Sequence, residues 1–450
     1  MEETRLAKEL FGTDGIRGVA GSPPLDQATV YAFGVALGRE AAAGRPAPEI
    51  VIGADTRESG AWLAGLVAGG LAAAGVGARF AGVTTTPAVA YLTRSGPFAA
   101  GVMISASHNP YRDNGIKVFD HSGFKLPDAE EHRIEQEIFR LRGSLSPRSS
   151  ALDADPALDG QYLAWLESIP KVRFEGLHVA LDCGNGAAYR LGPELFTRLG
   201  ARVTAFAAEP NGRNINLNCG ATCVEPLRQV VLEAGADCGV AFDGDADRAI
   251  FVSSRGKILN GDTVLLAAAR ALRAQGKLPG DLVVATVMSN LGLERALAAD
   301  GIRMLRTPVG DKYVLEEMVV IGAILGGEQS GHIIFRDCAT TGDGLLTALK
   351  LLEISQSFEY DLERMTADLV IYPQKLINVR VREKKELTEL PAVAREIRAV
   401  EAAFAGAGRV LVRFSGTEPL ARVMVEGPDL ERVEQFTESI AAAIRQEMGA

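Results

Sequence analysis

The chain has 450 residues, which is enough for three or four domains, because a single undivided core of that size is unusual. Hydrophobic residues make up 47% and charged residues 23%, a globular composition that excludes long disordered or collagen-like stretches. The formal net charge of −10 gives no basis for nonspecific nucleic-acid binding, so any anion site has to be a local basic pocket.

Targeting and redox features point to the cytoplasm. The opening residues, MEETRLAKEL, contain no basic region followed by an apolar run, and no later stretch has about 18 apolar residues without a charge. The five cysteines are odd in number and scattered, which favours reduced thiols over a disulfide framework. We therefore expect a soluble cytoplasmic protein that binds neither membranes nor nucleic acid.

One pattern of three strands occurs three times along the chain. Each copy starts with a short run that is too apolar for a half-exposed strand, which predicts a central strand buried on both faces. A helix and a second strand follow, and a third strand completes the copy. The predicted first strands lie in 49–60, 176–188 and 280–292, the second strands in 72–83, 198–206 and 298–306, and the third strands in 99–105, 238–242 and 322–326.

A polar loop follows each of the three third strands. These loops read SASHNP, DGDADR and GEQSGH. In open α/β sheets, ligand-binding groups gather beyond the carboxyl ends of the strands. The three loops are therefore expected to face one shared cleft.

The C-terminal segment has a different pattern, with a strand, a helix, two strands and a final helix from about residue 374. The sequence thus predicts an α/β protein: three similar three-layer α/β/α domains with mixed sheets, and a smaller C-terminal α+β domain. Turn-forming and charged clusters separate the expected domains. Their predicted bounds are 1–152, 153–255, 256–372 and 373–450.

The DGDADR loop predicts a metal site. Asp243, Asp245 and Asp247 alternate, so in an extended loop their side chains point the same way and repel one another unless a cation lies between them. Hard carboxylate oxygens with open coordination positions suit Mg²⁺. An EF-hand is excluded because Arg248 and Ser254 occupy positions six and twelve, where glycine and glutamate are needed. A solvated acidic turn is the alternative.

The SASHNP loop offers a phosphoryl-carrying serine. Ser107 is followed by His108, and Lys117 lies ten residues further on. Sequence neighbours rarely form a nucleophile and base pair, and no G-x-S-x-G elbow occurs, so a serine hydrolase is disfavoured. A phosphorylated serine could give an oxygen to the metal, while Lys117 stabilises phosphate charge or moves a proton. A turn-capping serine is the plain alternative.

Three further glycine-containing loops are candidate ligand-binding segments. RFSGTEP at 413–419 combines a small turn, two hydroxyls and the guanidinium groups of Arg413 and Arg422, as expected for a phosphate site or, alternatively, an ordinary hairpin turn. In FGTDGIRG, Arg17 offers another anion contact. In GEQSGH, polar side chains alternate between glycines and could hydrogen-bond a polyol, with an ordinary polar turn as the alternative.

Together, FGTDGIRG, ISASHNP, DGDADR, GGEQSGH and RFSGTEP, in this order over the whole chain, resemble the motifs of the α-D-phosphohexomutase superfamily. The resemblance implies a four-domain enzyme with three α/β domains and a fourth that closes on substrate. It also implies a phosphorylated Ser107 and a Mg²⁺ ion bound by Ser107, Asp243, Asp245 and Asp247.

The remaining site residues are implied by the same resemblance, position by position. The groups that assist phosphoryl transfer would be Lys117, His108, Arg17 and Arg248. The substrate-binding residues would be Glu328 and Ser330 for the sugar hydroxyls, and Arg413, Ser415, Gly416, Thr417, Arg422 and Lys312 for the phosphate that does not react.

Within the superfamily, GEQSGH, the Gly416 form of the phosphate loop and PNGRNIN at 210–216 are most similar to the members that act on glucosamine phosphates. The implied reaction interconverts glucosamine 6-phosphate and glucosamine 1-phosphate, feeding UDP-N-acetylglucosamine synthesis. A sugar 1,6-bisphosphate would be the intermediate and activator, and a homodimer is possible. A phosphomannomutase or phosphoglucomutase is the alternative within catalysis, and a metal-dependent sugar phosphatase and a non-catalytic binding protein are the other hypotheses.

Overall fold

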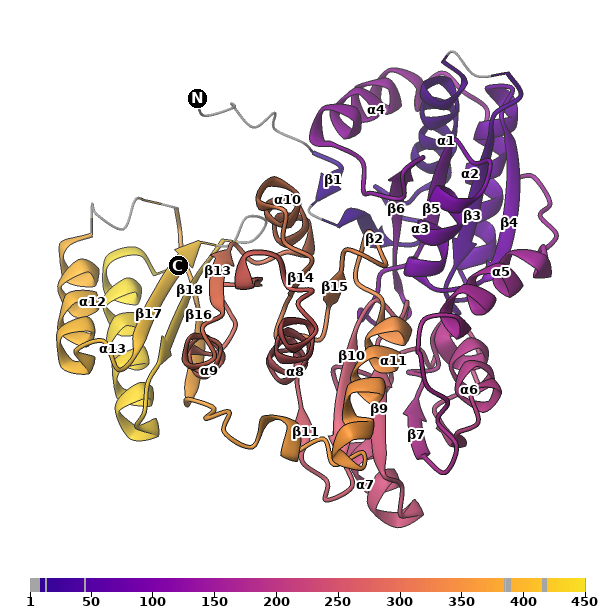
Figure 1. The fold of residues 1–450 in the computed structure, drawn as a ribbon. Helices are drawn as coiled ribbons and strands as arrows, with labels where there is room; N and C mark the ends of the chain where they lie inside the picture. Colours follow the sequence, from indigo (N-terminus) through magenta and orange to yellow (C-terminus); the bar gives the residue numbers. More distant parts are fainter. Residues whose placement is uncertain are drawn as a thin grey trace. The chain divides into compact units, whose positions relative to one another are not determined.

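The computed structural model describes residues 9–12, 14–43, 46–383, 385, 390–414 and 419–449 (Figure 1). By compactness the chain divides into two units, of which the first comprises Met1–Val287 and Leu305–Ala367 and the second Met288–Met304 and Asp368–Ala450. The two units are described separately. The division into four domains remains a prediction.

The first sheet of unit 1 is mixed. Strand β3 is parallel to β4 and β5, whereas β6 is antiparallel to β5 and β2 is antiparallel to β6. Ile50 and Ile52 of β3 pack into one core cluster and Val51 into another, so the strand is buried on both faces. The order is β1 (Phe11–Gly12), β2 (Gly15–Val19), β6 (Asp113–Asp120), β5 (Ala100–Ile104), β3 (Glu49–Ala54) and β4 (Gly77–Val83), and the helices are α1 (Gln27–Ala42), α2 (Gly60–Ala73), α3 (Thr86–Ser95) and α4 (Asp128–Leu141).

The second sheet repeats this arrangement, because β7 is parallel to β8 and β9, and β10 returns antiparallel to β9. Its order is β11 (Ile258–Leu259), β10 (Ala249–Ser253), β9 (Cys238–Phe242), β7 (His178–Asp182) and β8 (Arg202–Phe206). The accompanying helices are α5 (Pro156–Glu167), α6 (Ala188–Arg198) and α7 (Glu225–Ala234).

The third sheet is shorter but has the same plan, with β12 parallel to β14 and β15 antiparallel to β14. Its order is β13 (Arg303–Thr307), β12 (Leu282–Thr286), β14 (Leu325–Gly327) and β15 (Ile333–Phe335). The helices of this segment in unit 1 are α8 (Gly261–Ala274), α10 (Asp311–Ile321) and α11 (Gly344–Ser355), and the short 3₁₀ helices are Pro279–Asp281, Gln356–Phe358 and Arg364–Thr366. Helix α9 (Leu291–Ala299) belongs to unit 2.

The C-terminal part of unit 2 contains a three-stranded antiparallel sheet in the order β16 (Gln374–Arg380), β18 (Leu420–Glu426) and β17 (Arg409–Phe414). Helices α12 (Pro391–Phe404) and α13 (Leu430–Met448) pack against it. Val423 and Val425 of β18 share a core with Val393 and Ile440 of the two helices. Alternating apolar residues in the strand thus supply the buried face of the sheet.

The predicted fold class is confirmed: three α/β segments with mixed sheets precede a smaller domain with an antiparallel sheet. The sequence analysis missed one strand in each of the three copies, namely the antiparallel strand that follows the polar loop. These are β6, β10 and β15. Strands β10 (AIFVS) and β15 (IIF) are short apolar runs, whereas β6 (DNGIKVFD) mixes charged and apolar residues, and neither pattern alone shows that the segment pairs with the preceding strand. The third strand predicted at 322–326 instead spans Leu325–Gly327.

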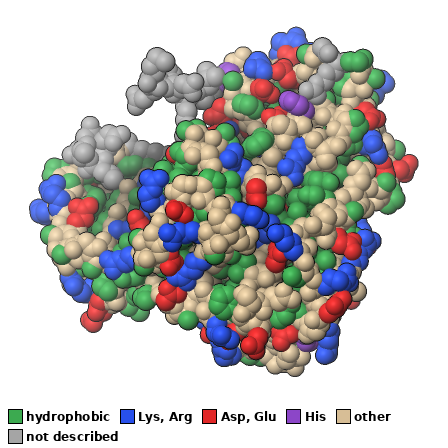
Figure 2. All heavy atoms as spheres, viewed as in Figure 1, with side chains coloured by type: hydrophobic (Ala, Val, Ile, Leu, Met, Phe, Trp, Pro, Cys, Tyr) green, Lys and Arg blue, Asp and Glu red, His purple; other side chains and the backbone are tan. Residues whose placement is uncertain are grey.

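The described surface mixes both signs of charge. Figure 2 shows basic and acidic side chains interspersed with hydrophobic groups on the face in view. Among the helices of the described residues, none has both the length and the apolar character needed to cross a bilayer.

Candidate active site

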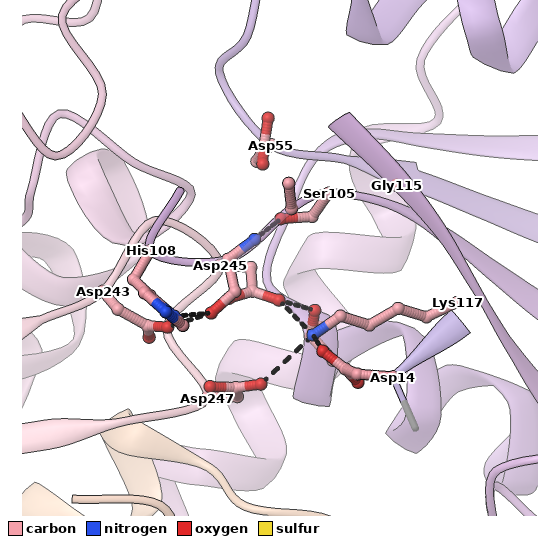
Figure 3. A network of polar contacts seen from close by, with 12 residues as sticks. Asp14, Asp55, Ser105, His108, Gly115, Lys117, Asp243, Asp245 and Asp247 are labelled. Carbon is pink, nitrogen blue, oxygen red and sulfur yellow. Dashed lines mark hydrogen bonds and ion pairs between the residues drawn. The ribbon is translucent and has the colours of Figure 1, made fainter. Parts of the chain in front are cut away.

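The polar loops that follow β5, β9 and β14 come together within unit 1. Figure 3 shows the first two of these loops, with His108 beside Asp243 and Lys117 directed at the acidic residues. Ser107 of the first loop contacts Asp243 of the second, and His332, which ends the third loop, lies 3.5 Å from Asp247. The carboxyl ends of three strands in three sheets therefore contribute to one polar centre, as the sequence analysis expected.

Ser107 occupies a strained and buried position in the first loop. Its φ is 53°, in the left-handed region that residues other than glycine rarely adopt, and its side chain is shielded from solvent. The Ser107 hydroxyl donates to Asp243 Oδ2 at 2.5 Å, and its Oγ lies 3.3 Å from His108 Nδ1. The backbone thus aims this hydroxyl at the acidic loop.

Asp243, Asp245 and Asp247 converge so that one carboxylate oxygen from each lies within 4.8 Å of the others. The reason differs from the prediction, because the loop is a tight turn with Ala246 at φ 56° and not an extended segment. Asp245 Oδ1 is buried and has no hydrogen-bond partner among the described residues. Three converging carboxylates, one with an open oxygen, are consistent with a site for a hard divalent cation.

Lys117 projects from β6 into this acidic cluster. Its Nζ lies 2.8 Å from Asp245 Oδ2, 3.3 Å from Asp247 Oδ2 and 3.1 Å from Asp14 Oδ2. Burial alone would lower the pKa of Lys117, but the negative charges of Asp14, Asp245 and Asp247 outweigh it and raise the pKa well above its ordinary value. The amine is therefore charged.

Two groups beside the Ser107 hydroxyl have shifted proton affinities. Burial and the nearby Asp247 and Asp245 raise the pKa of Asp243 well above the ordinary range. Burial, Arg248 and Arg17 lower the pKa of His108 to about 4, so its imidazole is neutral near pH 7. The centre thus holds a neutral histidine beside the serine and a charged lysine within the acidic cluster.

Arg17 and Arg248 line the same centre. Arg17 donates to the carbonyl of Ala106 at 3.3 Å and pairs with Asp14. Arg248 Nε lies 3.9 Å from Asp243 Oδ2 and 3.8 Å from Asp247 Oδ1. Both guanidinium groups balance part of the negative charge of the acidic loop.

The third loop supplies Glu328 and Ser330, which lie beside each other, with Ser330 Oγ 3.5 Å from Glu328 Oε2. Glu328 Oε1 also accepts the backbone N–H of Gly310 at 3.1 Å. Lys312 points toward α4, where its Nζ pairs with Asp128 and lies 3.6 Å from Glu131.

Sequence reasoning gave no role to a buried ionic chain that borders the acidic cluster. Lys125 Nζ lies 2.6 Å from both Asp14 Oδ1 and Asp311 Oδ2, and His332 lies 3.6 Å from Asp311. Burial opposes protonation of His332, but Asp247 and Asp311 outweigh it and raise the pKa to about 9. Asp14 and Asp311 sit in glycine-flanked motifs, FGTDG and VGDKY, which is the one sequence signal that could have marked them.

In unit 2, Arg413 of β17 and Arg422 of β18 are direct cross-strand partners. Burial, together with the charge of Arg422, lowers the pKa of Arg413. Two cations opposite each other on antiparallel strands repel, which favours an anion between them. The predicted phosphate-binding residues Ser415, Gly416 and Thr417 lie outside the described residues.

Comparison with known domain families identifies the class of protein to which this chain belongs. Four domain families, all named phosphoglucomutase/phosphomannomutase, match in chain order. They are α/β/α domain I at residues 8–143, α/β/α domain II at 161–256, α/β/α domain III at 260–371 and the C-terminal domain at 376–443. The resemblance to the α-D-phosphohexomutase superfamily is confirmed.

Individual relatives narrow the class. The phosphoglucosamine mutase of Solibacter usitatus is 69% identical over 445 residues, covering 99% of this chain and 100% of that protein. The chain belongs to the phosphoglucosamine mutase family of the phosphohexomutase superfamily, and it is an enzyme.

Solved structures share the fold. A phosphoglucomutase/phosphomannomutase family protein from Burkholderia thailandensis superposes with a TM-score of 0.80 at 24% identity, over 98% of this chain and 99% of that one. The N-acetylphosphoglucosamine mutase of Aspergillus fumigatus, in complex with GlcNAc-6P and magnesium, has a TM-score of 0.63 at 17% identity, over 97% and 96%.

Proposed function

We propose that this chain interconverts glucosamine 6-phosphate and glucosamine 1-phosphate through a phosphorylated Ser107 and a sugar bisphosphate. The observation that carries the proposal is the 2.5 Å contact of the Ser107 hydroxyl with Asp243 in a buried carboxylate cluster. The substrate follows from the 69% identity to a phosphoglucosamine mutase over nearly the whole chain.

Mg²⁺ is the metal that the acidic loop would hold, through Asp243, Asp245 and Asp247 with an oxygen on Ser107. The residues fit this ion, because all the donors are hard oxygens and Asp245 Oδ1 is a buried acceptor with no hydrogen-bond partner among the described residues. When bound, the ion supplies positive charge that offsets the charge of the transferring phosphoryl group.

The residues around Ser107 divide the transfer step between them. In the forward step the bond from phosphorus to Ser107 Oγ breaks and a bond from phosphorus to a sugar hydroxyl oxygen forms. Neutral His108 is suited to accept the hydroxyl proton, and charged Lys117 to stabilise the negative charge that develops on Ser107 Oγ. Arg17 and Arg248 act electrostatically on the phosphoryl oxygens.

The sugar and its second phosphate need groups of their own. Glu328 and Ser330 would bind the sugar hydroxyls, and Arg413, Arg422 and the hydroxyl-bearing loop between them would bind the phosphate that does not react. Lys312 is a further phosphate contact only if it leaves its pairing with Asp128. The bisphosphate must reorient without leaving, so that its other phosphate returns to Ser107.

The test is ³¹P NMR of the purified protein with Mg²⁺ and a trace of glucose 1,6-bisphosphate, run in parallel on glucosamine, glucose and mannose 6-phosphates. Faster conversion of the aminosugar supports the proposal, and faster conversion of a hexose phosphate would assign a phosphoglucomutase or phosphomannomutase. Accumulation of inorganic phosphate alone would indicate a phosphatase, and binding without transfer a non-catalytic protein.

Ser107→Ala checks the phosphoserine. We expect this variant to lose nearly all turnover, because the proposed carrier of the phosphoryl group is then missing. Ser122→Ala removes an exposed serine hydroxyl that donates to Asp120, and it serves as the matched control. Ordinary activity in Ser107→Ala would contradict the proposed mechanism.

The cytoplasmic location and the homodimer remain predictions. Sedimentation velocity at micromolar protein concentration tests the second.

A further inference from the structure

The strained conformation of Ser107 is held by two side chains that the proposed chemistry does not use. The loop 105–109, here called the Ser107 loop, places Ser107 at φ 53°. A residue with a Cβ persists there only if its surroundings fix it. Two side chains that donate to the carbonyl groups of Ser107 and Asn109 hold the loop in this conformation.

Arg57, in the loop after β3, is the first of these side chains. Its Nη2 donates to the carbonyl of Ser107 at 3.0 Å and to the carbonyl of Asn109 at 2.6 Å. Its Nη1 pairs with Asp55, and both side chains of this pair are fully buried. Because Asp55 balances its charge, Arg57 acts on the Ser107 loop through the geometry of its planar fork.

Asn216, from the segment after β8, is the second. Its Nδ2 donates to the same two carbonyls, at 2.9 Å to Ser107 and 3.2 Å to Asn109. Gly244 of the acidic loop leaves room for this arrangement, since a Cβ there would lie 2.5 Å from the Ser107 carbonyl oxygen and 2.9 Å from Asn216 Nδ2. The Ser107 carbonyl is thus enclosed by three separate chain segments.

We propose that Arg57 and Asn216 are positioning residues for phosphoryl transfer, which hold the Ser107 loop so that Oγ stays aimed at the acidic loop in both half-reactions. This inference rests on the proposed function, because it assigns a role only if Ser107 carries the phosphoryl group. Neither side chain is assigned to substrate or metal, so their loss should lower kcat and leave KM for the sugar phosphate nearly unchanged.

The decisive variants are Asn216→Gly and Asn216→Asp. Asn216 itself has φ 57°, a conformation that glycine and aspartate tolerate, so both variants remove the two donors without straining their own backbone. We expect kcat to fall by about 100-fold, the effect of misplacing a reacting atom by about 1 Å. Arg57→Lys keeps the charge but not the fork, and we expect the same direction of change.

The matched control is Arg213→Ala, three residues before Asn216. Arg213 Nε pairs at 2.7 Å with Glu58, the exposed residue that follows Arg57 in the sequence. Within the described part of the chain, no hydrogen bond or ion pair joins Arg213 to the Ser107 loop. We expect wild-type kcat from this variant. A loss equal to that of Asn216→Gly would overturn the proposal, because it would show a general effect of disturbing these segments.

The second readout is the ³¹P resonance of the phosphoserine itself, measured without substrate. We expect one sharp resonance in the wild-type protein and a shifted or broadened resonance in Asn216→Gly, because the phosphoryl group then samples several positions. Wild-type kcat and an unchanged resonance in both Asn216 variants would overturn the inference alone. If the wild-type protein shows neither phosphoserine nor mutase activity, the proposed function fails and the inference fails with it.

Discussion

The two carboxylate oxygens of Asp245 in the acidic cluster have different surroundings. It accepts from Lys117 and from the Thr86 hydroxyl through Oδ2, while its Oδ1 is left for a cation. Asp245→Asn keeps the shape of the side chain but removes one negative charge. The electrostatic attraction of the cluster for a divalent ion therefore decreases.

We predict that Asp245→Asn raises the Mg²⁺ concentration for half-maximal activity by at least about tenfold, since loss of even an outer-shell partner of a metal ligand costs that much. The rise in Tm that Mg²⁺ produces in the wild-type protein should also be lost, because an ion that binds only the folded state stabilises it. Asp153→Asn makes the same chemical change at an exposed site and is the control. An unaltered Mg²⁺ requirement would show that the ion binds elsewhere.

The pair of strands β17 and β18 carries its own prediction, because Arg413 and Arg422 face each other across the ladder. An anion between them removes their mutual repulsion, so millimolar phosphate or sulfate should raise the Tm of the transition that unfolds this sheet. Arg422→Ala should abolish the anion-dependent rise and weaken substrate binding by about 10- to 100-fold in KM, as expected for a charge-assisted contact of about 1.5–3 kcal/mol. Calorimetry at constant ionic strength, with chloride as the control, measures both effects. Equal stabilisation of the variant and the wild type by phosphate would contradict this prediction.

Helix α11 begins at a buried carboxylate whose protonation affects stability. Asp343 accepts the N–H of Leu346 at 2.9 Å and the hydroxyl of Tyr162 at 2.8 Å. Burial raises the pKa of Asp343 to about 6, although both of these donors oppose the rise. The unfolded value is about 4, so between about pH 4 and 6 the folded state holds a proton that the unfolded chain has released. Its contribution to stability therefore declines as pH rises through that interval.

We predict that Tyr162→Phe lowers stability by about 1–3 kcal/mol near pH 7.5, where it removes a donor from an ionised acceptor. Its effect should be smaller near pH 5, because the carboxyl is then largely protonated and needs that donor less. Thermal unfolding of the variant and the wild type at both pH values measures the difference. In an Asp343→Asn background the same tyrosine change should lose its pH dependence, and a pH-independent effect in the native background would contradict the assignment.

Across the whole molecule, the features that the sequence predicts correctly are the local ones. Runs such as EIVIGA and HVALD predict buried strands because their apolar residues continue without alternation, and β3 and β7 are indeed buried. The meeting of Ser107 with the acidic loop was also expected, since both follow the carboxyl ends of strands, where ligand-binding groups gather.

What could not be predicted depends on packing between distant segments. Lys125 contacts Asp14 and Asp311, which are 111 and 186 residues away from it. The residues around each of the three do not predict which residues it contacts. The turn at Ala246 shows a different limit. Alternating aspartates converge both in an extended segment and in this turn. Their spacing therefore predicted the site but not the backbone conformation of the loop.

The left-handed conformation at residue 107 also restricts which amino acid can carry the phosphoryl group. Threonine offers the same hydroxyl, but a β-branched side chain at φ 53° meets its own backbone, so the position admits serine and not its nearest chemical equivalent. Aspartate tolerates this conformation far better. The backbone at this site therefore admits a carboxylate in place of the phosphorylated serine, whereas it does not admit threonine as an alternative phosphoacceptor.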